Sequence, residues 1–130
     1  MTAENRIIDL RIVLTVDDLD AALRLYRDGL GLALVRSFPG GAILSAGPAT
    51  LELLSREESA SVDAIEGADA PSGPARLAIQ ATDSVAAAEA LVRAGARPAG
   101  APVTTPWGHR SVRVTTPEGL AITLFTATDG

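Results

Sequence analysis

A repeated order of elements is the feature that most constrains how this chain can fold. The segment LTVDDLDAALRLY at residues 14–26 aligns with IQATDSVAAAEAL at residues 79–91, and TLELL aligns in the same way with AITLF. The first alignment places Asp18 over Asp83, so an acidic helix cap follows the first strand in both halves. Two copies of the order strand-helix-strand-strand-strand predict a duplicated βαβββ module.

The first module is predicted to span residues 6–55. Apolar and polar side chains alternate over Ile7–Val16, which indicates a half-buried strand. Apolar residues then recur at helical spacing until a glycine-rich stop at residues 29–31. Three further strands are predicted between turn residues, at 32–38, 42–46 and 50–55.

The second module is predicted to span residues 75–127. Its first strand covers residues 75–82, and a helix begins directly afterwards at Asp83. The proline-flanked residues 97–101 can form an edge strand at best. The module ends in a hairpin of two alternating strands, which are joined by a Pro-Glu-Gly turn at residues 117–119.

Residues 56–74 interrupt this order. They are acidic, rich in Ser, Ala, Gly and Pro, and show no sustained apolar periodicity. We expect them to form a flexible linker between the modules, mobile over residues 67–73. The whole chain of 130 residues is predicted to form one domain with its own hydrophobic core.

Composition narrows the classes of function. The chain has no cysteine, which excludes disulfides, thiolate metal sites and cysteine nucleophiles. A net charge of −5 and a pI near 4.7 argue against nucleic acid as a partner. No apolar run approaches the roughly 20 residues that span a bilayer, and the N-terminus does not read as a signal peptide. We therefore expect a cytoplasmic protein that acts on neither nucleic acids nor membranes.

Three segments together resemble the vicinal oxygen chelate superfamily: LTVDDLDAALRLYRDGLGL, the TLELL strand and PWGHRSVRVTTPEGLAITLF. That superfamily includes glyoxalase I, extradiol dioxygenases, fosfomycin-inactivating transferases and bleomycin-resistance proteins. The resemblance covers nearly the whole chain. It implies an α+β fold, in which two βαβββ modules form a curled mixed sheet around an open cup. The helices are expected on the outer face of the sheet, and the protein is expected to form a homodimer.

Strand alternation predicts which side chains line this cup. The apolar set is expected to face the helices: Ile12, Leu14, Leu51, Leu53, Leu77, Ile79, Val112, Val114, Ile122 and Leu124. The intervening set is expected to face the cup: Arg11, Val13, Thr15, Glu52, Leu54, Arg76, Ala78, Gln80, Ser111, Arg113, Thr123 and Phe125. A register error of one residue would exchange the two sets.

The resemblance also places four metal-ligand positions, which hold His, Glu or Gln in metal-using members. In this chain they fall on Arg11, Glu52, Arg76 and Thr123. A guanidinium has no lone pair to donate to a divalent cation, so only Glu52 is a plausible ligand. The single histidine, His109, belongs to the loop before the last hairpin. We therefore expect no metal, no other cofactor and no catalytic residue.

The arginines of the cup have two readings. In one, Arg11 pairs with Glu52 while Arg76 and Arg113 are hydrogen-bonded to backbone, because unpaired buried charge is costly. In the other, one pair is neutralised and the surplus positive charge binds an anionic or carbonyl-rich ligand at Arg76 or Arg113, with Thr123 also counted among the candidate ligand-binding residues.

The aromatic residues also have two readings. Trp107 either covers the open end of the core or a dimer seam, or it stacks on a planar ligand at the rim with Phe38 opposite. Phe125 faces the cup from the last strand, and His109 is expected to be an exposed loop histidine near the same rim.

These observations favour a metal-free protein of the bleomycin-resistance type that sequesters a small ligand in its cup as a homodimer. An alternative is a glyoxalase-type lyase or isomerase, or an enzyme related to the dioxygenases of the superfamily. A third possibility is a regulatory or structural member that binds no ligand.

Overall fold

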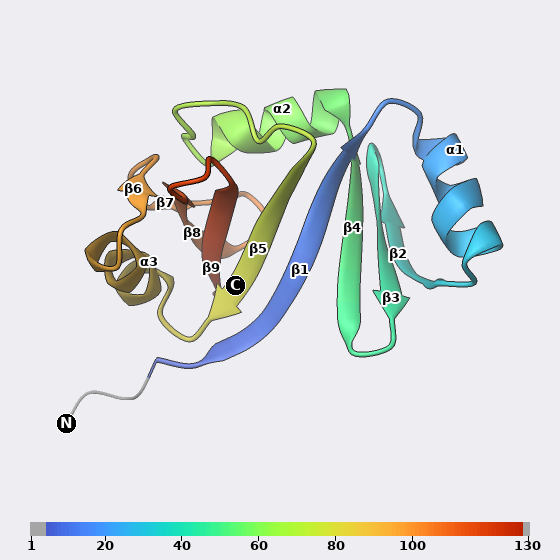
Figure 1. Cartoon of the computed structure of the whole chain (residues 1–130). Helices are drawn as coiled ribbons and strands as arrows, with labels where there is room; N and C mark the ends of the chain where they lie inside the picture. Colours follow the sequence, from blue (N-terminus) through green and yellow to red (C-terminus); the bar gives the residue numbers. More distant parts are fainter. Residues whose placement is uncertain (1–4, 129–130) are drawn as a thin grey trace.

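Two curled halves of one mixed sheet meet where β1 pairs antiparallel with β5 (Figure 1). The computed structural model describes residues 5–128. The sheet order is β2-β3-β4-β1-β5-β9-β8-β6, and β7 pairs with β8. The strands are β1 (Ile7–Val16), β2 (Ala33–Phe38), β3 (Gly41–Ala46), β4 (Ala49–Ser55), β5 (Ala75–Ala81), β6 (Arg97–Pro98), β7 (Val103–Thr104), β8 (His109–Thr115) and β9 (Ala121–Ala127). The helices are α1 (Leu19–Leu23), the π-helix η1 that continues it (Arg24–Gly29), α2 (Arg56–Ile65) and α3 (Ser84–Arg93).

The predicted duplication is confirmed by the strand pairing. β1 runs parallel to β4, and β5 runs parallel to β9, so each module returns its last strand beside its first. The helix caps repeat as well: Asp18 accepts a hydrogen bond from the backbone N–H of Ala21, and Asp83 accepts one from Ala86, both at 3.0 Å. Each cap stabilises its helix by about 1 kcal/mol.

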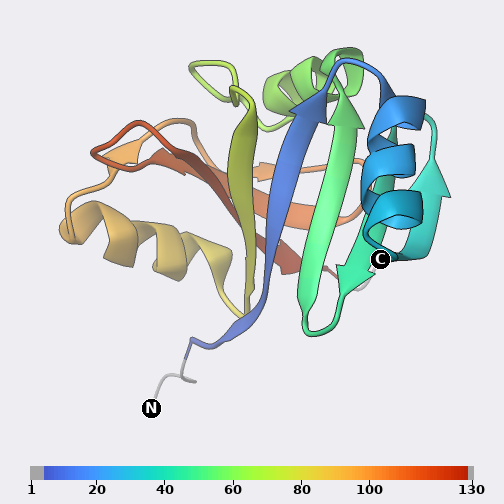
Figure 2. The same cartoon turned by 45° about the vertical axis from the view of Figure 1, so that its right-hand side comes forward.

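The predicted division of side chains between the two faces of the sheet is confirmed at most positions. On the convex face, α3 packs on apolar residues of the second module that include Val114 and Leu124. The first helix, α1, packs in the same way on Leu44 and Leu53 of the first module. Ile12 differs, since it is 45% exposed; Figures 1 and 2 show the middle of β1 uncovered between the two helices.

The expectation of an irregular linker is wrong over Arg56–Ile65, which form α2. Ser55 caps this helix by accepting a hydrogen bond from the backbone N–H of Glu58 at 3.1 Å. The buried positions repeat at helical spacing but are mostly polar: Ser59, Val62, Asp63 and Glu66. A search for apolar periodicity therefore misses the helix, because its inner face carries hydroxyl and carboxylate groups.

α2 lies on the concave side of the sheet, unlike α1 and α3, and crosses the top of the curled strands in Figure 2. Its Val62 packs with residues of that side from both modules: Val13, Leu54, Ala78 and Phe125. The rest of the predicted linker is tied to α2 by buried Ser72, whose N–H and hydroxyl both donate to the carboxylate of Asp63. No helix within residues 5–128 is long and apolar enough to cross a membrane.

Candidate functional site

A cavity of about 290 Å³ opens on the concave face of the sheet, between the two modules. It is lined by the candidate ligand-binding residues Arg11, Phe38, Glu52, Arg76, Trp107, His109, Thr123 and Phe125. Five side chains that were expected to face the cup do not line it: Val13, Thr15, Gln80, Ser111 and Arg113. The lining is Arg11, Arg36, Phe38, Ile43, Glu52, Leu54, Glu58, Val62, Glu66, Arg76, Ala78, Trp107, His109, Thr123 and Phe125. The strand register explains this gathering, since Arg11 lies opposite Ala78 and Arg76 lies opposite Val13 on paired strands.

Arg11 is neutralised by two carboxylates. Its Nη1 donates to Oε1 of Glu52 at 3.3 Å, and its Nη2 lies 3.5 Å from Oδ2 of Asp9. The guanidinium also lies 5.6 Å from the ring centroid of Phe125. Its buried Nε has no hydrogen-bond partner within the described part of the chain. The expected pairing of Arg11 with Glu52 is therefore present, and the buried Nε–H of Arg11 remains without a described partner.

Arg113 is fully buried and points into a network of side chains instead of the cavity. Its Nε lies 2.8 Å both from Oε1 of Glu66 and from Oγ1 of Thr123, and its Nη2 donates to Oδ1 of Asp63 at 2.8 Å. Both carboxylates belong to α2 and its C-cap, the segment that the sequence presented as a linker. The expectation that Arg113 would bond to backbone is thus wrong, because the segment of α2 supplies two acids; its assignment as a ligand-binding residue stays a prediction.

The carboxylate of Asp63 is adapted to this role. Burial alone would raise its pKa, but hydrogen bonds from Ser72 and Arg113 outweigh burial and lower it. Asp63 is therefore ionised in the folded protein and matches the charge of Arg113.

Arg76 is buried with far fewer partners. It is 5% exposed, and its one hydrogen bond within the described residues runs from Nη1 to Oγ1 of Thr123 at 3.0 Å. No described carboxylate oxygen lies within 4.0 Å of its guanidinium. Burial lowers the pKa of Arg76; Glu66 raises it, and Arg113 lowers it again. An arginine nevertheless stays charged, so a cation with spare N–H donors lines this cavity.

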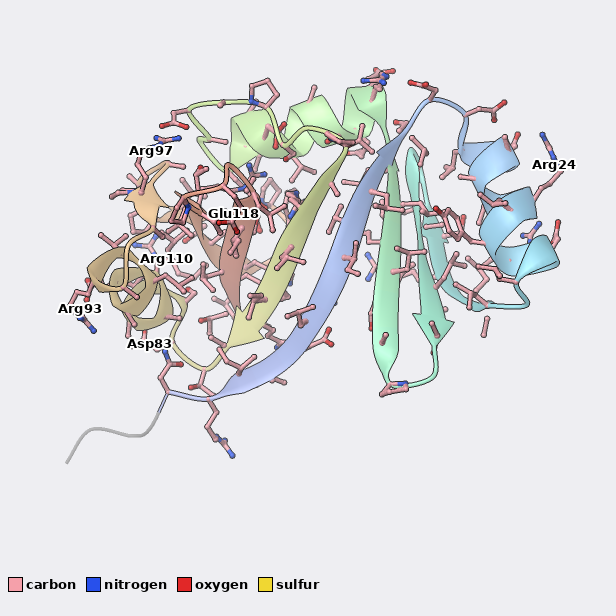
Figure 3. All side chains as sticks on the ribbon, in the orientation of Figure 1. Arg24, Asp83, Arg93, Arg97, Arg110 and Glu118 are labelled. Atoms are coloured by element: carbon pink, nitrogen blue, oxygen red, sulfur yellow. The ribbon has the colours of Figure 1, made fainter. Side chains whose placement is uncertain are left out.

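The exposed arginines show how unusual this placement is. Arg24 of η1 and Arg93 of α3 extend from the outer sides of their helices into solvent, as Figure 3 shows. Their side chains are exposed to bulk water, whereas Arg76 is 5% exposed and lies among the side chains that line the cavity.

An aromatic stack forms one wall of the cavity. The rings of His109 and Phe125 lie parallel, with centroids 4.4 Å apart and an interplanar angle of 15°. Trp107 stands nearly perpendicular to His109, at 83° and 6.4 Å, and its Nε1 donates to His109 Nδ1 at 3.2 Å. Because Nδ1 accepts a hydrogen bond, the neutral ring carries its proton on Nε2. Burial lowers the pKa of His109, and the Arg11 guanidinium lowers it further.

His109 is therefore not the exposed loop histidine that the sequence suggested. It begins β8 and lines the cavity, since the strand extends two residues farther toward the approach loop than alternation indicated.

Phe38 supplies an aromatic surface from the first module. A Cβ added to Gly41 would lie 2.3 Å from Cε2 of Phe38, so the ring rests directly against the bare backbone of β3. Arg36 lies 5.8 Å from the centroid of the same ring. The glycine thus sets the position of Phe38 at this side of the cavity.

The four positions that hold metal ligands in metal-using relatives all face the cavity: Arg11, Glu52, Arg76 and Thr123. The donor set does not fit a divalent cation, because two of the four are guanidinium groups and Glu52 is engaged by Arg11. In the described range, 5–128, no group of three or more His, Asp or Glu side chains could hold a metal ion.

Five residues that line the cavity escaped the sequence reasoning: Arg36, Ile43, Glu58, Val62 and Glu66. Glu58 belongs to α2 and Glu66 is its C-cap; Oε1 of Glu66 also accepts a hydrogen bond from the Thr123 hydroxyl at 2.7 Å. The helical spacing of Ser59, Val62, Asp63 and Glu66 could have predicted α2. A search for apolar periodicity does not detect it, because three of these four residues are polar.

Solved structures share this fold. One described as an NAD-dependent benzaldehyde dehydrogenase from Legionella pneumophila is 13% identical with a TM-score of 0.72, covering 92% of this chain and 99% of that one. A glyoxalase/bleomycin resistance protein/dioxygenase superfamily member from Vibrio splendidus is 12% identical with a TM-score of 0.63. The match covers 93% of this chain and 99% of that one. Methylmalonyl-CoA epimerase from Streptomyces coelicolor, in complex with 2-nitronate-propionyl-CoA, is 25% identical with a TM-score of 0.62, covering 95% and 99%.

A comparison with functionally curated proteins gives no match. The sequence model of the Glyoxalase/Bleomycin resistance protein/Dioxygenase superfamily matches residues 10–124, which is most of the chain. The duplicated βαβββ modules and the cavity between them agree with that match. The chain belongs to the Glyoxalase/Bleomycin resistance protein/Dioxygenase superfamily.

Proposed function

We propose that the protein binds a small anionic molecule in the concave cavity without a metal, as a ligand-sequestering protein of the bleomycin-resistance type. The observation that carries the proposal is the state of Arg76. It is a buried cation that lines the cavity, and its one described hydrogen bond is to a neutral hydroxyl. Buried charges are costly unless they are paired, so an anion at this position would stabilise the folded protein and be held by it.

The carboxylates in the neighbourhood of Arg76 are each engaged by another arginine. Arg11 is paired with Glu52 and Asp9, and Arg113 is paired with acids of α2. Arg76 is thus the buried arginine of the cavity lining without a described carboxylate partner, and an external carboxylate or phosphate could take that place. A charge-assisted bond from guanidinium to carboxylate is among the stronger polar contacts in proteins.

Isothermal titration calorimetry with acetate, benzoate and inorganic phosphate tests the proposal. We expect at least one of these anions to bind the wild-type protein, and Arg76→Gln to weaken that binding roughly 10- to 100-fold. Arg93→Gln serves as the matched control, because Arg93 is exposed on α3. Absence of binding at millimolar concentration, or binding that Arg76→Gln leaves unchanged, would overturn the proposal.

A second candidate is an isomerase or lyase, and the similarity to methylmalonyl-CoA epimerase at 25% identity favours it. Glu52 and Glu66 both line the cavity, so it contains carboxylates that could act as acid or base. Metal analysis of the purified protein separates the candidates: stoichiometric Zn, Ni, Mn or Fe supports the enzyme, whereas metal-free protein that binds anions through Arg76 supports the binder.

A further inference from the structure

The aromatic residues of this chain are concentrated around one cavity. The sequence contains two phenylalanines, one tryptophan, one tyrosine and one histidine, and aromatic residues make up 3% of the chain. Both phenylalanines, the tryptophan and the histidine line the cavity, whereas Tyr26 lies on η1 and packs against the buried cluster of Ala22, Leu44 and Leu53. Elsewhere the described core consists of Leu, Ile, Val and Ala. Aliphatic side chains would be enough to close the fold, so the flat side chains are placed where a ligand would meet them.

Charge and aromatic surface are separated by depth in the cavity. Arg76 is 5% exposed, whereas Trp107 at the rim is 43% exposed. The stacked pair of His109 and Phe125 lines the same cavity, and Trp107 lies edge-on to His109. A ligand that reached Arg76 with an anionic group would therefore leave the rest of its body beside the aromatic wall.

The aromatic walls come from both modules and are held in fixed orientations. His109 is fixed by its stack on Phe125 and by the hydrogen bond from Trp107. Phe38 is fixed by its contact with the backbone of Gly41. The neutral His109 ring presents a flat π-face, which can stack in an offset arrangement on a planar neighbour.

We infer that the ligand is an aromatic carboxylate, oriented with its carboxylate on Arg76 and its ring against the wall formed by His109, Phe125 and Phe38. The inference rests on the proposed function and names its ligand class. A cavity of about 290 Å³ lies at the lower end of the range for ligand pockets, so the acid carries one or two rings.

Three probes of equal charge separate the parts of this inference: acetate, cyclohexanecarboxylate and benzoate, each titrated by calorimetry and by Trp107 fluorescence. A wall that recognises only apolar bulk binds the saturated ring at least as well as benzoate, because the saturated ring has more apolar surface. A flat wall reverses this order. We expect benzoate to bind about fivefold more tightly than cyclohexanecarboxylate, and acetate to bind most weakly.

The variants Phe38→Leu and Arg76→Gln assign the two ends of the ligand. We expect Phe38→Leu to reduce the advantage of benzoate over cyclohexanecarboxylate to less than twofold while acetate binding is unchanged. Arg24→Gln is the control, since Arg24 is exposed on η1. Circular dichroism of each variant checks that it is folded. If Phe38→Leu does not fold, the ratio of benzoate to cyclohexanecarboxylate affinity in the wild-type protein still decides the question.

The two proposals fail in different ways. Equal affinity for benzoate and cyclohexanecarboxylate, with both lost in Arg76→Gln, overturns the aromatic inference and leaves anion binding intact. Binding of benzoate that persists in Arg76→Gln overturns the proposed function and the orientation together. No binding of any of the three acids overturns both.

Discussion

Arg113 and Arg76 are two buried arginines that share one threonine, and the structure treats them oppositely. Both donate to the hydroxyl of Thr123 on β9, Arg76 from β5 and Arg113 from β8, the strands on either side of β9. Arg113 meets Asp63 and Glu66 at 2.8 Å, whereas Arg76 has no described carboxylate within 4.0 Å. The difference teaches that burial alone does not define a structural arginine. What matters is whether the fold provides the matching anion, and here α2 provides it for only one of the two.

Removing the anion from Arg113 gives the largest expected effect. Glu66→Ala should lower the free energy of unfolding by about 3–5 kcal/mol, because it leaves a buried cation with part of its compensation. Urea denaturation with an unchanged m-value measures the loss. Glu118→Ala, at an exposed turn, is the control and should change stability by less than about 0.5 kcal/mol. A loss as small as that of the control would show that the pair contributes nothing.

Removing the charge from Arg76 should change the free energy of unfolding in the opposite direction. Arg76→Met should raise the free energy of unfolding by about 1 kcal/mol, since it removes a desolvated cation that lacks an anionic partner and keeps the packing volume. The same urea experiment measures the change, with acetate and benzoate omitted from the buffer. A loss of several kcal/mol would mean that Arg76 is already compensated in the way Arg113 is, and the contrast would disappear.

Acid should destabilise the protein by protonating Asp63, which weakens the Arg113 network. The folded protein lowers the pKa of Asp63 below its ordinary value of 3.8. Asp63 therefore contributes stability that is present above pH 3.8 and is lost as the pH falls through the lower folded pKa. Asp63→Asn should flatten the dependence of unfolding free energy on pH in that range. An unchanged slope in Asp63→Asn would contradict the assignment.

A smaller pH effect is expected at the aromatic wall. The folded protein lowers the pKa of His109 below 6.5. The neutral ring therefore stabilises the fold fully above pH 6.5, and this contribution declines as the pH falls from 6.5 toward the folded pKa. Phe125 and Trp107 contact the ring, and Arg11 is the charged group that opposes its protonation. Titration of the ring by NMR gives its pKa directly, and a value above 6.5 would contradict this sign.

Much of the fold could be predicted from the sequence because its signals are local. Apolar alternation marked β1, β5, β8 and β9, and the aspartates at positions 18 and 83 marked the starts of two helices. The resemblance between the two halves then fixed the topology, and with it the set of strands that line the cavity.

The role of α2 could not be predicted in the same way. Its buried face carries Ser59, Asp63 and Glu66, which become core residues only because Arg113 and neighbouring hydroxyls lie opposite them. That pairing joins positions about 50 residues apart in the chain, and no local pattern contains it. The same omission explains why Arg113 was expected to be available to a ligand.

The central claim is that Arg76 is an anion-binding group in a cavity whose family metal positions have been replaced. A crystal structure of the protein grown with a high concentration of benzoate tests it most directly. The account predicts a carboxylate within hydrogen-bond distance of the Arg76 guanidinium, with Arg113 still bonded to Asp63 and Glu66. A metal ion coordinated by protein atoms at that place, or an Arg76 side chain turned out of the cavity while benzoate binds elsewhere, would contradict it.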